Sequence, residues 1–268
     1  MDGVQAEFRD VSDQEAQRAN RADWDRESDD YQSEHGSFLR DDGFVWSPEG
    51  VDEAAVGLLG DVRGRRVLEL GCGAAQCCRW LAGQGAEVVG LDLSERQLQH
   101  SRRIDQGERQ QVPVVCGSAT ALPFLDGGFD LACSAFGALS FLVDIAAGLH
   151  EVKRVLSPGG RCVFSVVHPV RWMFADDPGM GGTTVVRSYF DRRPYVELDD
   201  DGRPSYVEPH HTLADWVRAI TAAGLRFDAL LEPEWPPGHD REWGGWGPVR
   251  GALVPGTAIF TVSRPTGA

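Results

Sequence analysis

Short hydrophobic runs alternate with amphipathic segments over most of the chain. The runs are largely apolar without a polar position at every second residue, which is typical of strands buried on both faces of a parallel sheet. The segments between them repeat hydrophobic residues with the period of a helix. This alternation predicts a doubly wound α/β sheet with right-handed crossovers. The predicted strands are 65–70, 86–93, 112–117, 129–135, 161–167, 225–234 and 256–265, and the predicted helices between them are 74–85, 95–107, 142–156 and 212–224.

Capping residues mark several helix ends. Ser94 stands directly before the segment 95–107, where its hydroxyl is placed to cap a helix. Ser47 followed by Pro48 predicts the start of a further helix, which Gly60 would end.

The N-terminal part of the chain is polar and acidic. Residues 15–36 have helical character, with Trp24 and Tyr31 seven positions apart on one face. We therefore expect an N-terminal helix that packs its aromatic face against the rest of the protein.

A second departure from the strand–helix pattern covers residues 170–210. Alternation there predicts strands at 183–190 and 194–198, followed by a turn at 199–202. An insertion of this length in a compact domain is usually functional or disordered, and its aromatic residues argue against disorder.

The stretch VLELGCG places an acid, Glu69, at the end of the first predicted strand, with Gly71 and Gly73 directly after it. A Gly-x-Gly turn lets the backbone approach a ligand, and the helix that follows offers free N–H groups. In a doubly wound sheet this point lies at the carboxyl edge, where ligands bind. A NAD-type fingerprint has a third glycine where this chain has Gln76, and a carboxylate at position 69 does not suit a pyrophosphate loop. It suits a cofactor that carries an amino group and a sulfonium.

Asp92 ends the second predicted strand. A carboxylate at that point can accept two hydrogen bonds from ribose hydroxyls. The alternative is an acid near Ser94 that is favoured by the dipole of the following helix. The upstream Glu69-x-Gly71-x-Gly73 favours ribose binding.

Four segments together resemble the class I S-adenosylmethionine-dependent methyltransferases: VLELGCG, VVGLDLS, ALPFLDGGFDL and VKRVLSPGGRCVFS. Within that family the chain resembles the bacterial small-molecule branch, which includes ubiquinone- and menaquinone-biosynthesis enzymes. The resemblance covers about residues 45–168, with a weaker similarity towards the C-terminus. It implies a Rossmann-like, seven-stranded sheet whose last strand is antiparallel, with S-adenosyl-L-methionine as cofactor.

The resemblance also implies which residues surround the cofactor. Asp92 would hold the ribose, and Leu93 would pack on the adenine. Ser118 stands where many relatives have Asp, so its contact with the adenine edge is weaker or made differently. The full set implied is Tyr31, Glu69, Gly71, Cys72, Gly73, Asp92, Leu93, Ser118, Ala119, Ser134, Ala135 and Phe136.

These observations predict one structural domain in four parts. Residues 1–46 form a helical cap or lid, 47–168 the cofactor-binding core, 169–210 an inserted segment on the acceptor side after the fifth strand, and 211–268 the rest of the core with a Trp/Pro/Gly-rich loop.

Three histidines are candidate general bases for methyl transfer. His168 follows the fifth strand at the carboxyl edge, and the ordinary pKa of its side chain suits proton transfer near neutral pH. A hydrogen-bonded structural histidine beside Pro169 is the alternative. His210 and His211 precede the helix that begins near Thr212, where they could reach the pocket or face solvent.

Aromatic residues gather in the regions around the predicted acceptor site. Trp24, Tyr31 and His35 would form a lid or simply pack an amphipathic helix. The aromatic and cationic residues of the insertion and the late loop would form a wall for a planar or apolar acceptor, pack the insertion, or make a dimer contact. They are Arg171, Trp172, Phe174, Tyr189, Tyr195, Trp235, Trp243 and Trp246.

The composition narrows the class of protein. The formal net charge of −15 gives no basic footprint for nucleic acid. No stretch is long and apolar enough for a membrane span, and the start of the chain lacks the features of a signal peptide. The six cysteines have no C-x-x-C spacing, so we expect buried thiols in a reducing cytoplasm and no metal site.

The sequence thus predicts a cytoplasmic bacterial methyltransferase for a small organic acceptor, with oxygen or nitrogen favoured over carbon. Two alternatives stay open: an RNA or protein methyltransferase, and a binding or regulatory protein that keeps the cofactor fold without catalysis. A NAD-dependent oxidoreductase is more distant. The sequence does not separate a monomer from a homodimer.

Overall fold

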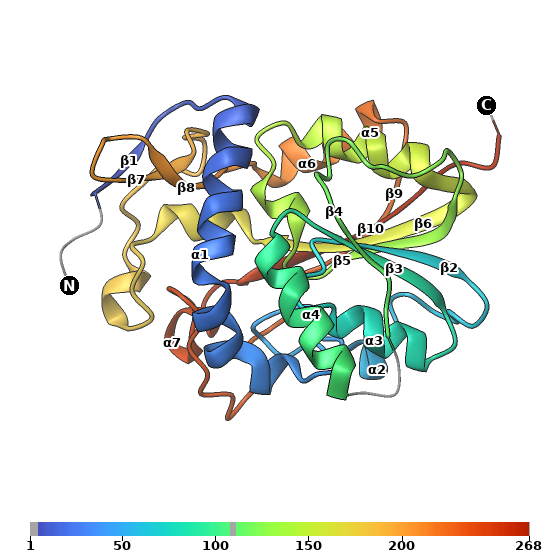
Figure 1. The fold of residues 1–268 in the computed structure, drawn as a ribbon. Helices are drawn as coiled ribbons and strands as arrows, with labels where there is room; N and C mark the ends of the chain where they lie inside the picture. The colour runs from blue at the N-terminus through green and yellow to red at the C-terminus, as the bar shows by residue number, and fades with distance from the viewer. Residues whose placement is uncertain (1–4, 108–110, 268) are drawn as a thin grey trace.

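A seven-stranded sheet forms the centre of the computed structural model, which describes residues 5–107 and 111–267 (Figure 1). Its strands are β2 (Arg66–Leu70), β3 (Glu87–Asp92), β4 (Val114–Cys116), β5 (Phe129–Ser134), β6 (Leu156–Val167), β9 (Arg226–Leu231) and β10 (Thr257–Ser263). Their order is β4-β3-β2-β5-β6-β10-β9, and only β10 runs antiparallel to its neighbours. The predicted doubly wound sheet with an antiparallel last strand is confirmed.

Helices cover both faces of this sheet (Figure 1). The helices are α1 (Asp13–Leu39), α2 (Glu53–Val56), α3 (Gln76–Gly83), α4 (Glu95–Gly107), α5 (Ile145–Val155), α6 (Leu213–Ala222) and α7 (Pro248–Gly251), with 3-10 helices η1 (Ala138–Phe141), η2 (Pro169–Met173) and η3 (Met180–Thr183). Neighbouring strand residues divide between two cores: Val67 packs with α3 and α4, and Leu68 packs with α5 and α6. Burial on both faces is why these strands read as continuous apolar runs.

The helix caps agree with the sequence at α4 and differ at α2. The Ser94 hydroxyl accepts the backbone N–H of Gln97 at 3.1 Å, as predicted for the start of α4. The helix predicted from Ser47 onward is wrong, because α2 covers only one turn. Asp52 caps the start of α2. The buried carboxylate of Glu53 accepts the N–H groups of Leu58 and Leu59, so the chain leaves the helical path after one turn.

A second, three-stranded sheet joins the N-terminus to the insertion. It consists of β1 (Gln5–Phe8), β7 (Tyr195–Leu198) and β8 (Pro204–Glu208), in the order β1-β7-β8 and antiparallel throughout. The strand predicted at 194–198 and the turn after it are confirmed, with Gly202 donating to the carbonyl of Asp199 at 2.9 Å. β1 was not predicted, because its partner strand begins only at Tyr195, far away in the sequence.

The strand predicted at 183–190 is wrong. Within it only Val185 makes a β-bridge, to Phe174, and η3 takes up the beginning of the segment. Val186 is 64% exposed, so no layer covers this run, and its alternation does not correspond to a buried face.

The long helix α1 connects the small sheet to the core. Ala16 and Ala19 pack against valines of β7 and β8. The Asn20 side-chain amide donates to the carbonyl of Val207 at 2.9 Å and accepts its N–H at 2.8 Å. Because β8 is an edge strand, Asn20 satisfies backbone groups that would otherwise lack a partner.

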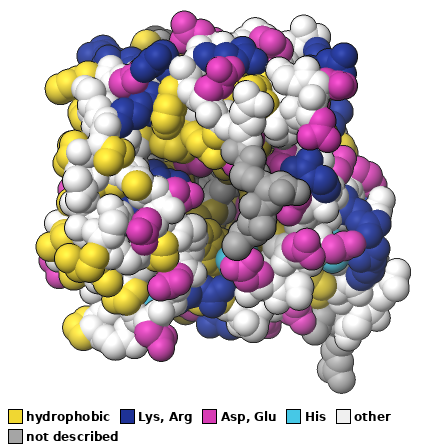
Figure 2. Space-filling view, turned by 90° about the vertical axis from the view of Figure 1, so that its left-hand side faces the viewer, with side chains coloured by type: hydrophobic (Ala, Val, Ile, Leu, Met, Phe, Trp, Pro, Cys, Tyr) yellow, Lys and Arg dark blue, Asp and Glu magenta, His cyan; other side chains and the backbone are white. Residues whose placement is uncertain are grey.

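The surface on the left of Figure 1 faces the viewer in Figure 2. Acidic and basic side chains are intermixed there around a hollow, so this face offers no continuous basic surface to a polyanion (Figure 2). In the described part of the chain, no helix combines the length and the hydropathy that a membrane crossing requires.

Replacing Asn20 with alanine tests the attachment of α1 to β8. The Asn20→Ala variant leaves a buried N–H and a buried C=O without partners, so we expect the free energy of unfolding to fall by about 2 kcal/mol. Urea denaturation followed by circular dichroism measures the change. Gln14→Ala, at an exposed position of the same helix, is the control and should match the wild type. Equal stability of both variants would contradict the role of Asn20.

Candidate active site

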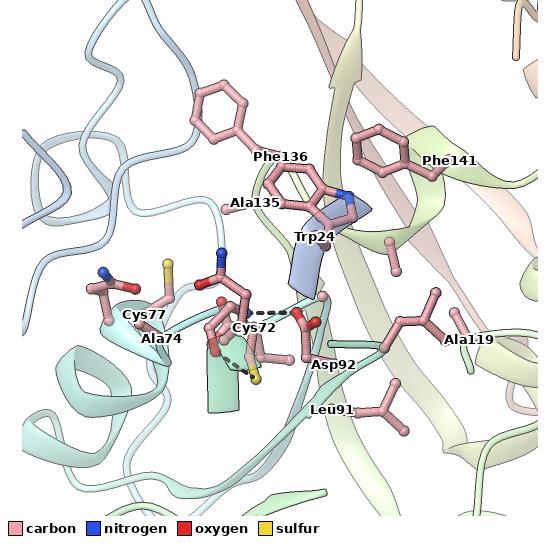
Figure 3. Close-up of a pocket in the computed structure, with 18 of the residues that line it drawn as sticks. Trp24, Cys72, Ala74, Cys77, Leu91, Asp92, Ala119, Ala135, Phe136 and Phe141 are labelled. Atoms are coloured by element: carbon pink, nitrogen blue, oxygen red, sulfur yellow. Dashed lines mark hydrogen bonds between the residues drawn. The ribbon is translucent and has the colours of Figure 1, made fainter. Parts of the chain in front are cut away.

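A cavity opens at the carboxyl ends of β2, β3, β4 and β5, beneath α1 (Figure 3). Most of the residues that the sequence placed around a cofactor meet at this cavity. Those that line it are Tyr31, Glu69, Gly71, Cys72, Gly73, Asp92, Leu93, Ser118, Ala119, Ala135 and Phe136.

Glu69 is the most unusual polar group of the cavity. Glu69 is only 2% exposed, and its Oε2 atom has no hydrogen-bond partner. Burial raises the pKa of this carboxyl group to about 7. A buried carboxylate without a cation is unfavourable, so the site is suited to a ligand that brings a positive charge or a hydrogen-bond donor.

Asp92 is held in a fixed orientation at the end of β3. Its Oδ2 accepts the N–H of Gly73 at 2.7 Å (Figure 3). Its Oδ1 accepts the N–H of Ser94 at 2.8 Å. Burial raises the pKa of Asp92, although these backbone bonds oppose the shift. Each oxygen keeps a free lone pair, so the carboxylate can accept further hydrogen bonds from a ligand.

The two glycines of the turn serve different purposes. Gly71 has φ +69°, and a Cβ there would lie 2.2 Å from the backbone N of Ala138. Gly73 has φ +52°, and a Cβ there would meet only the distant Gln97 side chain. Gly71 therefore permits the close packing of two loops of this chain, and Gly73 leaves space inside the cavity.

The charge of the cavity is negative. Glu69 and Asp92 line it, and no Lys, Arg or His lines it within the described ranges. Amide side chains supply the remaining polar groups: Gln76 donates to Gln32 at 3.0 Å, and Gln32 donates to Gln97 at 2.9 Å. The arrangement suits a ligand with a net positive charge.

Four aromatic rings form the wall opposite these carboxylates. Trp24 packs edge-on against Tyr31 and against Phe141, with ring centroids 5.3 and 5.6 Å apart. Phe136 extends the wall from the loop after β5 (Figure 3). A planar or apolar group can pack there.

This wall differs from the predicted one. None of the aromatic residues proposed from the insertion and the late loop lines the cavity. Trp243 instead stacks between His35 and Phe136, with centroids 3.8 and 5.2 Å from its own, so it supports the wall from behind. Trp172 stacks on Tyr195 and packs the insertion.

Four predicted site residues do not line the cavity, and two of them, Ser134 and His168, make buried structural contacts. Ser134 is buried, and its hydroxyl donates to the carbonyl of Leu70 at 2.7 Å, so it ties β5 to β2. His168 is buried with both ring nitrogens occupied: Nε2 pairs with Glu232 Oε1 at 2.8 Å, and Nδ1 accepts the N–H of Val170 at 3.3 Å. Burial lowers the pKa of His168 despite the Glu232 carboxylate. The geometry is that of a structural histidine.

His210 and His211 line a second, smaller cavity on the other side of η1. His211 Nε2 is 2.8 Å from the carbonyl of Leu142, which itself lines the first cavity. The structure therefore brings these two histidines near the site but not into it.

Sequence reasoning missed several lining residues. Gln17, Asn20 and Gln32 line the cavity from α1 beside Trp24 and Tyr31. Positions 17, 20, 24 and 31 fall on one face of a helix. A helical projection of the sequence would therefore have placed Gln17 and Asn20 beside Trp24 and Tyr31. Phe141 lies seven residues beyond the end of β5, and no sequence motif indicated it.

Comparison with known proteins identifies the family. Residues 68–164 match the family described as "Methyltransferase domain". A demethylmenaquinone methyltransferase of Corynebacterium kroppenstedtii is 41% identical over 207 residues, which cover 75% of this chain and 77% of that protein. The chain belongs to the class I S-adenosylmethionine-dependent methyltransferases. A demethylmenaquinone methyltransferase of Mycolicibacterium vanbaalenii is 43% identical over 176 residues, or 63% of this chain and 70% of that one.

Solved structures show the same fold. An S-adenosylmethionine-dependent methyltransferase from Mesorhizobium loti aligns with a TM-score of 0.63 and 26% identity, covering 81% of this chain and 98% of that one. A 1,6-didemethyltoxoflavin-N1-methyltransferase of Burkholderia thailandensis, solved with 1,6-didemethyltoxoflavin and S-adenosylhomocysteine, aligns over 99% of this chain and 97% of that one, with a TM-score of 0.61 and 17% identity.

The cavity of this methyltransferase fits S-adenosylmethionine. The cofactor has a sulfonium and an ammonium against one carboxylate, and the cavity offers the buried carboxylate of Glu69, the half-buried carboxylate of Asp92 and no cationic side chain within the described ranges. The partnerless Oε2 of Glu69 and the free lone pairs of Asp92 are the acceptors that such a ligand needs. No group of three or more His, Cys, Asp or Glu residues in 5–107 and 111–267 could hold a metal ion.

The pH dependence of cofactor binding tests Glu69. Binding of a cation favours the ionised carboxylate, whose pKa is about 7 in the free protein. We expect the affinity for S-adenosylmethionine to be constant above pH 7. Below pH 7 the affinity should fall by at most about tenfold for each pH unit. Calorimetry in buffers of different ionisation enthalpy measures the affinity and the proton released. Glu69→Gln should bind more weakly and show a flat profile, and a flat wild-type profile would exclude this role.

Replacing His168 distinguishes a base from a structural residue. The His168→Ala variant should lose about 1–3 kcal/mol of unfolding free energy, because it removes a buried side chain together with its two hydrogen bonds. Turnover, measured by incorporation of labelled methyl, should stay within about threefold of wild type, whereas loss of a general base costs about a hundredfold or more. His150→Ala, on the exposed part of α5, is the control. A hundredfold loss of turnover with unchanged stability would show that His168 acts in catalysis.

Proposed function

We propose that this methyltransferase acts on an oxygen or nitrogen atom of a small planar organic compound. The observation that carries the proposal is the aromatic wall of Trp24, Tyr31, Phe136 and Phe141, in the same cavity as the carboxylates of the cofactor site. Flat rings pack favourably on such a wall. The intermixed charges on the face in Figure 2 and the net charge of −15 favour a small acceptor over RNA.

The cofactor contacts follow from the positions of the lining residues. Glu69 accepts hydrogen bonds from the ammonium of the methionine part. Asp92 accepts from the ribose hydroxyls, and Leu93 packs on the adenine. Ser118 and Ala119 lie at the adenine end, where the Ser118 hydroxyl already bonds to Thr120 at 2.9 Å. Cys72, Ala135, Phe136 and Tyr31 line the remaining length. These roles are supported by the shared cavity and by the family pattern.

The chain's own residues enclose and order the site. S-adenosylmethionine, when bound, supplies a methyl group on a strongly electrophilic sulfonium. Asp25 of α1 accepts the Ser94 hydroxyl at 2.6 Å and the N–H of Arg96 at 3.0 Å, which fastens α1 over the start of α4. Gln32 bridges α1 to Gln76 and Gln97 on the opposite wall. This closure excludes water and holds an acceptor near the cofactor, which are the main contributions a protein makes to such a displacement.

Acid–base groups are scarce in the first cavity. No histidine lines it within the described ranges, and burial raises the pKa of the Tyr31 hydroxyl. A neutral amine needs no base for methylation. A hydroxyl acceptor benefits from one, and His35 packs against the cavity-lining Tyr31 with ring centroids 4.7 Å apart.

A quinone-type acceptor is the second candidate. The curated relatives cited above are named for demethylmenaquinone, and a quinone ring is also planar. Their similarity spans 63% and 75% of this chain, so part of the chain has no counterpart in the comparison. RNA or protein methylation is the alternative substrate class. A cytoplasmic location stays a prediction, and so does a monomeric or homodimeric state.

Labelled S-adenosylmethionine tests the substrate class. The protein is incubated with the methyl-labelled cofactor and a lysate of the source organism, and the products are fractionated by size. We expect label in the small-molecule fraction, where mass spectrometry names the methylated atom. Asp92→Ala, which loses charged hydrogen bonds to the cofactor, should bind it about a hundredfold more weakly and give almost no label. Label confined to RNA or protein would overturn the proposal, and label on a quinone ring carbon would favour the second candidate.

A further inference from the structure

Three neighbouring strands bring polar groups to the first cavity in a fixed order. Glu69 belongs to β2, Asp92 ends β3, and Ser118 is the second residue after β4, while the order of these strands in the sheet is β4-β3-β2. Adjacent strands lie about 4.8 Å apart, so the three residues follow one another along the carboxyl edge. A cofactor with its ammonium at Glu69 and its ribose at Asp92 therefore has its base beside Ser118.

Gln17 reaches this end of the cavity from α1. It lines the same cavity as Ser118, and its Nε2 donates to the hydroxyl of Thr120 at 3.0 Å. The Thr120 hydroxyl is in turn 2.9 Å from that of Ser118. No residue of the described ranges donates a hydrogen bond to Gln17 Oε1. The carbonyl oxygen of this amide is thus available to a donor on a ligand.

The two hydroxyl groups have one hydrogen to spare. A single O–H donates between Ser118 and Thr120, and the N–H of Thr120 donates to Ser118 Oγ at 3.2 Å. Ser118 lines the cavity, whereas Thr120 does not. An acceptor atom in the cavity therefore selects the arrangement in which Thr120 donates to Ser118 and Ser118 donates to the ligand.

This arrangement also fixes the amide of Gln17. Because the Thr120 hydroxyl then donates to Ser118, it accepts from Gln17 Nε2, and Oε1 is the atom left for the ligand. The cavity so presents an acceptor, Gln17 Oε1, and a donor, the Ser118 hydroxyl. The complementary ligand edge is a donor beside an acceptor. Adenine has such an edge, because its amino group donates and the ring nitrogens on either side of that group accept.

Contacts on both sides of Gln17 hold this part of α1 in place. One turn earlier, Asp13 Oδ1 accepts the N–H of Asp144 at 2.9 Å. Three residues later, Asn20 bonds both backbone groups of Val207. The Gln17 side chain is thus carried by a fixed segment, which lowers the cost of ordering it when a ligand binds.

We propose that Gln17 of α1 recognises the adenine amino group of the cofactor, while the Ser118 hydroxyl donates to a ring nitrogen beside it. Gln17 is then a residue that determines which base the enzyme accepts, and it takes no part in the chemical step. The inference rests on the proposed function, because it takes Asp92 as the contact of the ribose. It also joins the base to the helix that supplies Trp24 to the aromatic wall.

Two ligands that differ only at the amino group test this role. They are S-adenosylhomocysteine and its analogue in which hydrogen replaces the amino group of the base, and calorimetry on the full-length protein gives the dissociation constant of each. We expect the wild type to bind S-adenosylhomocysteine about tenfold more tightly, as expected for one hydrogen bond. Equal affinities of the wild type for the two ligands would overturn the proposal.

Variants of Gln17 separate recognition of the base from a structural role. Gln17→Leu removes the acceptor, so the two ligands should bind with equal affinity, whereas Gln17→Glu keeps an acceptor and should keep the preference for the amino group. Gln14→Leu, at an exposed position of α1, should behave as the wild type. A Gln17→Leu variant that binds both ligands more weakly but keeps the tenfold preference would show that Gln17 only supports α1, and would overturn its role in recognition.

The Ser118→Ala variant tests the donor of the pair. Both ligands keep the ring nitrogens, so Ser118→Ala should weaken both by the same factor, about tenfold, and leave the preference for the amino group in place. Unchanged affinity for both ligands would exclude the hydroxyl of Ser118 from the contact.

Asp92→Ala and labelled-methyl incorporation keep this inference apart from the proposed function. Asp92→Ala should weaken both ligands equally, and an unchanged affinity would reject the proposed ribose contact. Methyl transfer to a small molecule by a wild type that binds both ligands equally rejects the role of Gln17 and leaves the proposed function standing. Loss of the preference in Gln17→Leu, with label found only in RNA or protein, supports the role of Gln17 and counts against the proposed function.

Discussion

The close approach of two loops at the carboxyl edge of the sheet is the constraint on which the rest of the structure depends. Gly71 lies against the backbone of Gly137 and Ala138, so closely that no other residue fits there. Ser134 reinforces the contact by donating to the carbonyl of Leu70. Because η1 follows directly, this contact sets the positions of the residues that line both cavities.

Electrostatics then decides what the first cavity can hold. Glu69 is buried and Asp92 is half-buried, and their hydrogen bonding differs: backbone N–H groups stabilise Asp92, whereas one oxygen of Glu69 has no partner. A buried carboxylate without a hydrogen-bond partner is tolerated where a bound ligand supplies the donor. Carboxyl groups with perturbed pKa values are concentrated at functional sites. The absence of a lining cation within the described residues gives the cavity its selectivity for a positively charged cofactor.

The acceptor side depends on segments that are distant in sequence. α1 supplies Trp24 and Tyr31, the loop after β5 supplies Phe136 and Phe141, and Trp243 stacks behind them. Asn20 attaches α1 to β8, so α1 and the small sheet form one unit. A change in the insertion can therefore alter the acceptor site without touching the cofactor.

The sequence by itself determined the central sheet, its helices and most of the cofactor side, because these depend on local patterns: buried runs, caps, and a turn whose glycines follow Glu69. It did not determine the aromatic wall, the small sheet or the state of the histidines. Those depend on which distant segments pack together. β1 pairs Gln5 with Leu198 of β7, and His168 is hydrogen-bonded to Glu232, a residue that no local pattern links to it. Only the tertiary structure separates a histidine with both nitrogens occupied from one, His210, that keeps a free lone pair in a cavity.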